Sequence, residues 1–347
     1  MTNRALLTAL CHILNTTTSE TMHTLESLQE AAGTNERLST FTQTITATPL
    51  QFRHMTSADS AAIAPILATE PSRTCDYTVG GMIMWADYFH YDAAIVDDTL
   101  FVKGVTENDI TTPAFSLPVG NMPLGESLAL IRDYCAEHDI IPILSAVPED
   151  RLEEILTHGP AKVEELVDWA DYLYDIDVMS TFAGKRMSKK RNHVNRFRAD
   201  NPDAEFRPIT RADIPELVEF VSKMHPALNK SLTAEYELMK TIEILNDLDS
   251  YPTFEGALLR IPGKGVAAFT IGEAVGDTLY AHIEKIDHQY NGAGETVSSR
   301  FCAMMKERHP ELKYVNREDD SGDPGLRKAK LDYHPLTLLK KYNVTLL

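Results

Sequence analysis

The chain has 347 residues, of which 43% are hydrophobic and 24% are charged. This composition is typical of a soluble globular protein, and the length suits two domains of ordinary size, each able to bury its own core. The formal net charge of −18 argues against wholesale binding to DNA or to anionic membranes.

The sequence also limits the compartment and the cofactors. No stretch approaches the roughly 18 apolar residues needed to cross a bilayer. The apolar segment 5–14 is better explained as an amphipathic helix than as a secretory signal. None of the four cysteines stands in a CxxC pair, and the twelve histidines lack the spacing of metal ligands. We therefore expect a cytoplasmic protein with no metal site and at most peripheral contact with membranes.

The chain divides into an extension and two predicted domains. Residues 1–49 are rich in Thr and Ser, which predicts a poorly packed extension with one or two helical pieces. Phe52–Asp59 and Phe206–Asp213 lie 154 residues apart, and each predicts a short strand ending in Thr before a helix with Asp in its first turn. This repeat predicts a duplication with domains at 50–175 and 176–347, although helix caps of this kind also recur by chance.

Each predicted domain alternates short strands and helices. In the first, we expect strands near Met82–Trp85, Ala93–Val96 and Thr99–Lys103, a helix at Ser127–His138 and a strand at Ile141–Leu144. In the second, we expect strand Glu205–Ile209, helices Ile214–Met224 and Ala234–Leu248, strands Phe254–Ile261, Val266–Glu273 and Thr278–Asp287, helix Thr296–Arg308 and strand Lys313–Asn316, before a last helix and strand. The turn Gly263-Lys264-Gly265 predicts a hairpin.

A basic segment opens the second domain. From Lys185 to Arg198 the chain carries many cations and no acidic residue, in a protein that is otherwise acidic. So dense a cluster predicts a phosphate-binding surface, for a tRNA backbone or for coenzyme A, and the alternative is a solvated basic helix face. The candidate phosphate-binding residues are Lys189, Lys190, Arg191, His193 and Arg196.

The predicted strand Thr278–Ile286 carries candidate proton-transfer groups. Its period of two places Tyr280, His282 and Glu284 on one face. An acyl transfer needs a base that takes a proton from the attacking amine, and His282 titrates near neutrality, as would Glu284 if burial raised its pKa. The alternative is a structural His–Glu pair on a half-exposed sheet.

The run Gln289–Gly294 lies between this strand and the next predicted helix. Gly292 and Gly294, with Ala293 between them, allow backbone amides to point at one position at a helix start, where the helix dipole favours an anion. With Gln289, the run resembles the pyrophosphate loop of the GNAT acyltransferase superfamily, Q/R-x-x-G-x-G/A. A plain strand-to-helix turn explains the glycines about as well.

Three residues near the C-terminus are further candidates. Arg317, at the end of the next predicted strand, could bind a carboxylate or phosphate with its planar guanidinium, or form a surface pair with a neighbouring acid. Arg327 could extend the phosphate-binding surface. Tyr333 lies in the region where GNAT enzymes often place a tyrosine that protonates the leaving group, and a buried core tyrosine is the alternative.

Two longer stretches make a family resemblance specific. Asp171–Asp175 leads to the basic segment Gly184–Phe197, and Asn316–Pro335 has the sequence NREDDSGDPGLRKAKLDYHP. Together they resemble the soluble bacterial proteins related to the C-terminal catalytic domain of phosphatidylglycerol lysyltransferases, over roughly residues 50–347. The resemblance implies an α/β (α+β) fold of tandem GNAT-like domains, each a mixed, mostly antiparallel sheet flanked by helices.

The resemblance also implies a transferase. Lysyltransferases of this kind, and the similar Fem peptidoglycan aminoacyltransferases, move an aminoacyl group from a charged tRNA to an acceptor amine or hydroxyl. We expect this reaction here, with a small molecule or an envelope precursor as acceptor and tRNA as a partner. No cofactor is expected beyond the co-substrate, which is aminoacyl-tRNA or, in the alternative, acetyl-CoA or another acyl-CoA. Because no GxSxG-type nucleophile motif is present, direct attack on the ester or thioester is expected.

Two other functions stay open. The loop at Gln289–Gly294 would equally suit a coenzyme A-dependent N-acyltransferase, and a non-catalytic GNAT scaffold could bind a nucleotide-like ligand with the same elements. The sequence holds no counterpart of the membrane-spanning half that delivers lipid in the lysyltransferases, which weakens the expectation of phosphatidylglycerol as acceptor.

Overall fold

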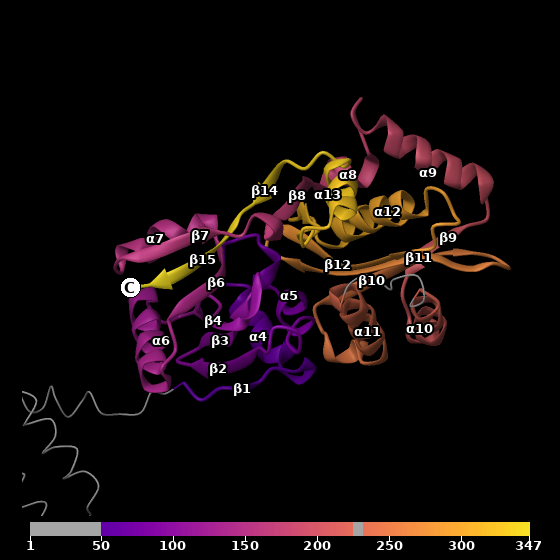
Figure 1. The fold of residues 1–347 in the computed structure, drawn as a ribbon. Coiled ribbons are helices and arrows are strands. Elements are labelled where there is room, and N and C mark those ends of the chain that lie inside the picture. Colours follow the sequence, from indigo (N-terminus) through magenta and orange to yellow (C-terminus); the bar gives the residue numbers. More distant parts are fainter. Residues whose placement is uncertain (1–49, 225–231) are drawn as a thin grey trace, which may run out of the picture. The chain divides into compact units, whose positions relative to one another are not determined.

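A computed structural model describes residues 50–224 and 232–347, and Figure 1 shows the arrangement of their elements. These residues fold into two mostly antiparallel sheets with helices packed against them, as expected from the sequence. The extension predicted at 1–49 lies outside the described residues. Within the described part of the chain, no helix is both long enough and apolar enough to cross a membrane.

The first sheet has the strand order β1-β2-β3-β4-β6-β15-β7, with β5 paired to β3. All neighbours are antiparallel except β4 and β6, which meet in parallel at Phe115 and Leu144. The strands are β1 (Arg53–His54), β2 (Asp92–Val96), β3 (Thr99–Thr106), β4 (Asp109–Phe115), β5 (Val119–Gly120), β6 (Ile143–Pro148), β7 (Ala161–Glu165) and β15 (Lys341–Leu346). The accompanying helices are α4 (Ser60–Leu67), α5 (Val79–Ile83), α6 (Leu124–His138) and α7 (Leu152–Thr157).

The second sheet has the order β14-β8-β13-β12-β11-β10-β9, and only β12 and β13 are parallel. Figure 1 shows α12 on one face of this sheet and α10 and α11 on the other. The strands are β8 (Asp171–Asp175), β9 (Glu205–Pro208), β10 (Phe254–Ile261), β11 (Gly265–Val275), β12 (Thr278–Ile286), β13 (Tyr314–Asn316) and β14 (Thr337–Leu339). The helices are α8 (Ile176–Thr181), α9 (Ser188–Asp200), α10 (Ile214–Ser222), α11 (Leu232–Asn246), α12 (Ala293–Arg308) and α13 (Pro324–Leu331).

The two sheets exchange strands along the chain. β8 lies in the second sheet, although residues 171–175 fall within the first predicted domain. β15 returns from the C-terminal end and lies between β6 and β7 of the first sheet. The division into 50–175 and 176–347 stays a prediction, and the strands on either side of it are interleaved between the sheets.

The internal repeat has the same hydrogen bonds in both copies. In the first, the Thr56 amide donates to the Asp59 carboxylate at 2.8 Å, and Arg53 forms an ion pair with the same carboxylate. The same contacts recur at Arg207, Thr210 and Asp213. In each copy one buried carboxylate therefore satisfies a free amide at a helix start and neutralises the cation of the preceding strand.

Sequence patterns predicted the second sheet better than the first. The elements expected between residues 205 and 316 all form, with ends within three residues of those predicted, and the Gly263 turn does join the hairpin of β10 and β11. The strand expected at Met82–Trp85 is wrong, because Thr78 accepts a hydrogen bond from the Gly81 amide and starts helix α5 there. The apolar run that suggested a buried strand is instead a short helix buried on most sides.

The repeated cap should contribute measurably to stability. Replacing Asp213 with Ala removes both the cap of the Thr210 amide and the partner of Arg207, so we expect a loss of about 1–2 kcal/mol in the free energy of unfolding. Urea denaturation measures the loss. Glu219→Ala, which removes only an exposed pair with Lys223, should stay within about 0.5 kcal/mol of the wild type. Equal effects of the two changes would contradict a structural role for the cap.

Candidate functional site

The candidate site lies where two parallel strands part. β12 and β13 pair at only three positions, and the last joins Tyr280 to Asn316. Beyond it, β12 continues along β11, whereas the chain after β13 turns toward β8, where the Arg317 amide donates to the Tyr172 carbonyl at 3.1 Å. Side chains rather than backbone hydrogen bonds therefore connect the two strands beyond this point.

A β-bulge divides these side chains between the two faces of the sheet. The register of β11 and β12 shifts between Ile271 and Gly272, which leaves His282 as an extra residue in β12. As a result, Leu279 and Ile283 pack into different core clusters. Of the three residues expected on one face, Tyr280 and His282 lie together, but Glu284 lies on the other face because the bulge interrupts the period of two.

On the face toward α5, His282 lies between two carboxylates. Its Nε2 is 2.9 Å from Glu273 Oε1 and its Nδ1 is 2.8 Å from Glu318 Oε1, and none of its side chain is exposed. Glu273 also accepts hydrogen bonds from the Gly80 amide and the Thr253 hydroxyl, both at 2.7 Å. Both ring nitrogens of His282 therefore have partners, and the ring has no free face toward solvent.

This arrangement favours a charged imidazole. Burial disfavours the imidazolium, but the hydrogen bonds that it donates to Glu273 and Glu318 outweigh burial and raise the pKa of His282 to about 9. Burial would raise the pKa of Glu273, yet His282 and the Gly80 amide hold it below its usual value. For Glu318 burial prevails and the pKa is raised. His282, as the structure has it, is a protonated partner of two carboxylates rather than a free base.

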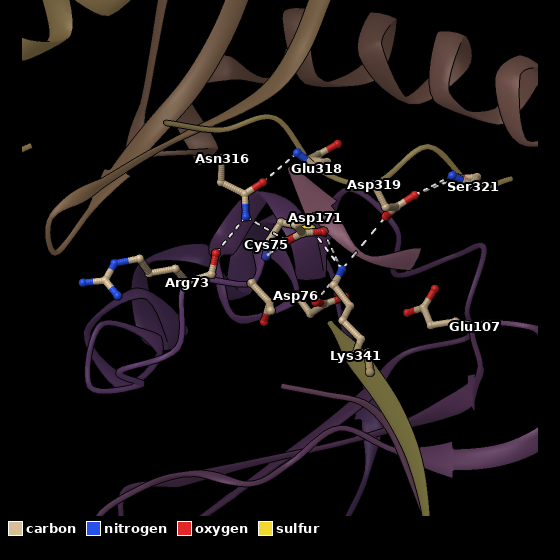
Figure 2. A network of polar contacts seen from close by, with 12 residues as sticks. Arg73, Cys75, Asp76, Glu107, Asp171, Asn316, Glu318, Asp319, Ser321 and Lys341 are labelled. Carbon is tan, nitrogen blue, oxygen red and sulfur yellow. Dashed lines mark hydrogen bonds and ion pairs between the residues drawn. The ribbon is translucent and has the colours of Figure 1, made fainter. Parts of the chain in front are cut away.

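A buried polar network continues from this face into the first sheet (Figure 2). The Lys341 ammonium lies 2.8 Å from Asp76 Oδ2 and 2.8 Å from Asp171 Oδ1, and only 1% of its side chain is exposed. Asp171 also accepts from the Cys75 amide at 2.6 Å and from the Asn316 side-chain amide at 2.8 Å. The network thus joins β15, β8 and β13 to the turn that precedes α5.

Burial governs the titration of the groups around Lys341. It raises the pKa of Asp76 to about 6 and raises the pKa values of Glu107 and of the Cys75 thiol well above their usual ranges. Cys75, Asp76 and Asp171 are spaced as metal ligands could be, but the Lys341 ammonium already lies against the two carboxylates. The two carboxylates are therefore paired with a cation of the chain itself, and the absence of a metal stays a prediction.

On the opposite face, toward α12, the site is built around Tyr333. Arg317 donates to Glu284 Oε1 at 2.9 Å, and its guanidinium carbon lies 4.6 Å from the centre of the Tyr333 ring. The Lys190 ammonium lies 3.6 Å from the same ring centre. Tyr333 is 7% exposed and belongs to the core cluster of this face, and burial raises the pKa of its hydroxyl. The structure thus brings together four predicted residues, Arg317, Glu284, Tyr333 and Lys190.

The glycine loop is covered by helix α9. Gly292 has a φ of +86° and caps α12, and a Cβ on it would lie 2.2 Å from the His193 carbonyl oxygen. The Glu295 carboxylate lies at this helix start, 2.8 Å from His193 Nδ1 and 3.5 Å from the Lys190 ammonium. Ala293 and Gly294 are buried, and the Gln289 side chain turns back to Asp287. A carboxylate of the chain therefore lies where the helix dipole favours an anion.

The other predicted phosphate-binding residues fall into two groups. Arg191 donates to the Gly184 carbonyl at 2.6 Å, Arg196 pairs with Asp200, and Arg327 pairs with Asp320 and Asp168. Among the described residues no ion pair or hydrogen bond engages the exposed side chains of Lys185, Arg186 and Lys189. Within the basic segment Lys185–Arg198, these three side chains therefore present charge to solvent without an internal partner.

Sequence patterns missed several residues of the site. Glu273 ends a long apolar stretch of β11, and a charged residue in such a position is a signal that could have been used. For Glu318 the sequence indicates only a surface pair with Arg317, as one of the acids next to it. For Lys341 and Asp171 no sequence signal distinguishes them from exposed charges, because their burial follows from the exchange of β8 and β15.

Two mixed sheets, each flanked by helices, with a parallel pair that parts at the polar site, make up the tandem GNAT-like fold expected from the sequence. The chain belongs to the family described as phosphatidylglycerol lysyltransferase, C-terminal, whose model matches residues 68–345. An uncharacterized protein of Mycoplasmoides gallisepticum is 23% identical over 50% of this chain and 55% of its own length. The chain thus spans about half the length of this curated relative.

Solved structures share the fold. A conserved protein of unknown function from Bacteroides thetaiotaomicron is 29% identical, with a TM-score of 0.77 over 87% of this chain and 100% of that one. The C-terminal domain of a putative lysylphosphatidylglycerol synthetase from Agrobacterium fabrum is 13% identical, with a TM-score of 0.59 over 83% and 92%. FemX is 11% identical, with a TM-score of 0.55 over 86% and 98%. These likenesses confirm the predicted fold.

Gly80 should be essential for the packing of His282. A Cβ at this position would lie 2.3 Å from His282 Nε2, and both carboxylate partners prevent the ring from turning away. We expect Gly80→Ala to lower the free energy of unfolding by about 1–3 kcal/mol. Gly125→Ala is the matched control, because its Cβ would meet the exposed ring of His158, which can move. A neutral Gly80→Ala variant would mean that the imidazole is not held as described.

The charge of His282 should appear in the pH dependence of stability. Because its folded pKa is about 9 and its ordinary value 6.5, its contribution is complete below pH 6.5 and is lost as pH rises through 9. Over that window the free energy of unfolding should fall by on the order of 3 kcal/mol. Urea denaturation at a series of pH values measures the slope. His282→Gln should remove it and His158→Gln should not; an unchanged slope in His282→Gln would show that another group causes it.

Proposed function

We propose that this protein is an aminoacyltransferase that moves an aminoacyl group from aminoacyl-tRNA to an amine or hydroxyl acceptor in the cytoplasm. The family match spans both sheets, which supports a transferase of the lysyltransferase and Fem type. The choice of aminoacyl-tRNA as the donor rests on how the glycine loop at residues 289–294 is packed. Its helix start lies beneath α9 and beside Glu295, and this arrangement favours a tRNA ester over a coenzyme A thioester as the donor.

The exposed cations before and at the start of α9 suit a polynucleotide. Lys185, Arg186 and Lys189 lie close together in the chain, and each is exposed. Phosphate contacts of this kind add affinity without base specificity, as a transferase that accepts the end of a tRNA requires. We place the acceptor stem of the tRNA on this surface, with the aminoacyl ester directed toward the parting of β12 and β13.

The chemistry requires positioning and proton transfer. No covalent intermediate is needed, because an amine or hydroxyl can attack the ester carbonyl directly once both are held in place. Where the strands part, Glu318, His282 and Glu273 lie together on one face, and Arg317 lies with Tyr333 on the other. The acceptor is a small molecule or an envelope precursor.

A coenzyme A-dependent N-acyltransferase is the second candidate. The sequence of the loop at residues 289–294 favours it, since Gly292 caps helix α12 and Gly294 lies in its first turn. Opening the loop for a pyrophosphate would require His193 and Glu295 to move, which makes this candidate the weaker one. A non-catalytic scaffold is the third candidate. Binding alone does not require a protonated His282 between two carboxylates, so this feature gives the scaffold no support.

Removing the exposed cations should weaken tRNA binding. We expect a Lys185→Ala, Arg186→Ala, Lys189→Ala triple variant to bind tRNA less tightly and to lower the slope of log affinity against log salt by about 2–3. Filter binding of charged and uncharged tRNA over a range of salt concentrations measures both. The control is Lys162→Ala with Lys223→Ala, which removes exposed cations of β7 and of the end of α10.

A parallel measurement separates the donors. Under the proposal, acetyl-CoA gives no saturable rise in melting temperature, while charged tRNA binds in a salt-dependent way. A saturable rise with acetyl-CoA and no binding of tRNA would overturn the proposal in favour of the N-acyltransferase. An unchanged salt slope in the triple variant would mean that these cations form a solvated surface and do not contact tRNA.

A further inference from the structure

Glu318 has an unusual backbone. It lies two residues after the end of β13 and has a φ of +58°, a left-handed conformation that costs a residue with a side chain about 1 kcal/mol or more. Its amide donates to the Asn316 side-chain oxygen at 2.6 Å, and its carbonyl accepts from the Tyr172 amide at 3.2 Å. The strained conformation is thus fixed on both sides, and it directs this carboxylate to His282 where β12 and β13 part.

Glu318 also differs from the other acids of the network. Asp76 and Asp171 each lie 2.8 Å from the Lys341 ammonium, and Asp319 accepts from the backbone and hydroxyl of Ser321. Among the described residues, the Glu318 carboxylate has one hydrogen-bond partner, His282, through Oε1, and 20% of its side chain is exposed. Its second oxygen is therefore available to a substrate.

His282 and Glu273 lie behind Glu318 rather than beside a substrate. Neither side chain has any exposed surface, and both nitrogens of the imidazole are already bonded. Phe254 and Tyr280 stack on the ring at centroid distances of 5.6 and 6.3 Å. The pair can fix the orientation and charge of Glu318 but cannot reach a reacting atom.

We propose that Glu318 is the catalytic proton acceptor of the transfer and that His282 and Glu273 are its positioning residues. The proposal rests on the proposed function and adds the group that activates the acceptor, an amine or a hydroxyl. Burial raises the pKa of Glu318, which makes this carboxylate a stronger base than an exposed one. The ion pair with His282 limits this rise and keeps the orientation of the acid fixed.

The step balances without a cofactor. The nucleophile attacks the ester carbonyl carbon, the new bond to that carbon forms, and the bond from the carbon to the ribose oxygen of the tRNA breaks. Glu318 takes the proton of the nucleophile and returns it to the departing ribose oxygen. The products are the aminoacylated acceptor and uncharged tRNA, and Glu318 is again a carboxylate.

The test compares the rate-pH profiles of variants. The donor is bacterial tRNA charged with labelled amino acids, the probe acceptor is ethanolamine, which offers both an amine and a hydroxyl, and a parallel series uses acetyl-CoA. For the wild type, the transfer rate should fall at low pH, which gives the profile an acidic limb, because Glu318 must be ionised to accept a proton. The charged and titratable groups facing the Glu318–His282 pair are Glu273, Tyr280, Asp319, Lys330 and Cys75.

Glu318→Gln should lower the transfer rate by about 10²–10⁴-fold, abolish the acidic limb and leave tRNA affinity unchanged. Glu318→Asp should restore part of the rate and the limb. His282→Gln should shift the limb rather than abolish it, since the acid stays while its partner is lost. Glu255→Gln is the matched control, because it removes the carboxylate from another Glu–His pair, with His309, away from the parted strands.

The outcomes distinguish failure of the Glu318 proposal from failure of the proposed function. A folded Glu318→Gln variant with wild-type rate and acidic limb overturns the role of Glu318 and leaves the proposed function in place. Transfer from acetyl-CoA alone, lost in Glu318→Gln, supports the role of Glu318 while overturning the tRNA donor. No transfer by the wild type from either donor overturns both.

Discussion

The buried ammonium of Lys341 is the interaction on which the rest of the structure depends. It belongs to a strand of the first sheet, yet one of its carboxylate partners, Asp171, begins a strand of the second. A charge at this depth is tolerated only when it is paired, and loss of one partner of a buried pair typically costs about 3–5 kcal/mol. The same Asp171 holds Asn316, and Asn316 in turn holds the Glu318 amide. The geometry of the candidate site therefore depends on the contact between the sheets.

The two faces of the parted strands carry different chemistry for a simple reason. A single extra residue in β12 directs His282 toward α5 and Glu284 toward α12. One face then holds carboxylates around an imidazolium, which suits proton transfer. The other holds an arginine and a lysine against an aromatic ring, which suits an anionic or aromatic group. The bulge thus separates two functions that a regular strand would have mixed on one surface.

The sequence predicted the fold class and most of the second sheet, because its strands alternate and its helices have caps that local rules recognise. The cap at Thr210 and Asp213 is an example, since two residues three positions apart determine it. The candidate site was predicted only in part, because its geometry depends on distant residues. A period of two cannot reveal the bulge at His282, and nothing near Lys341 indicates that Asp76 and Asp171 will surround it. The glycine pattern was found, but the cover supplied by His193 and Glu295 comes from tertiary packing.

The exchange of strands also constrains how the chain can fold during synthesis. β15 lies between β6 and β7, and it is made 176 residues after β7 ends. Until β15 has been synthesised, β6 has one unpaired edge and β7 has no partner strand, and unpaired edges attract other strands. The two sheets cannot mature one after the other, as separate domains do. The first sheet to be translated is therefore among the last parts of the fold to be completed.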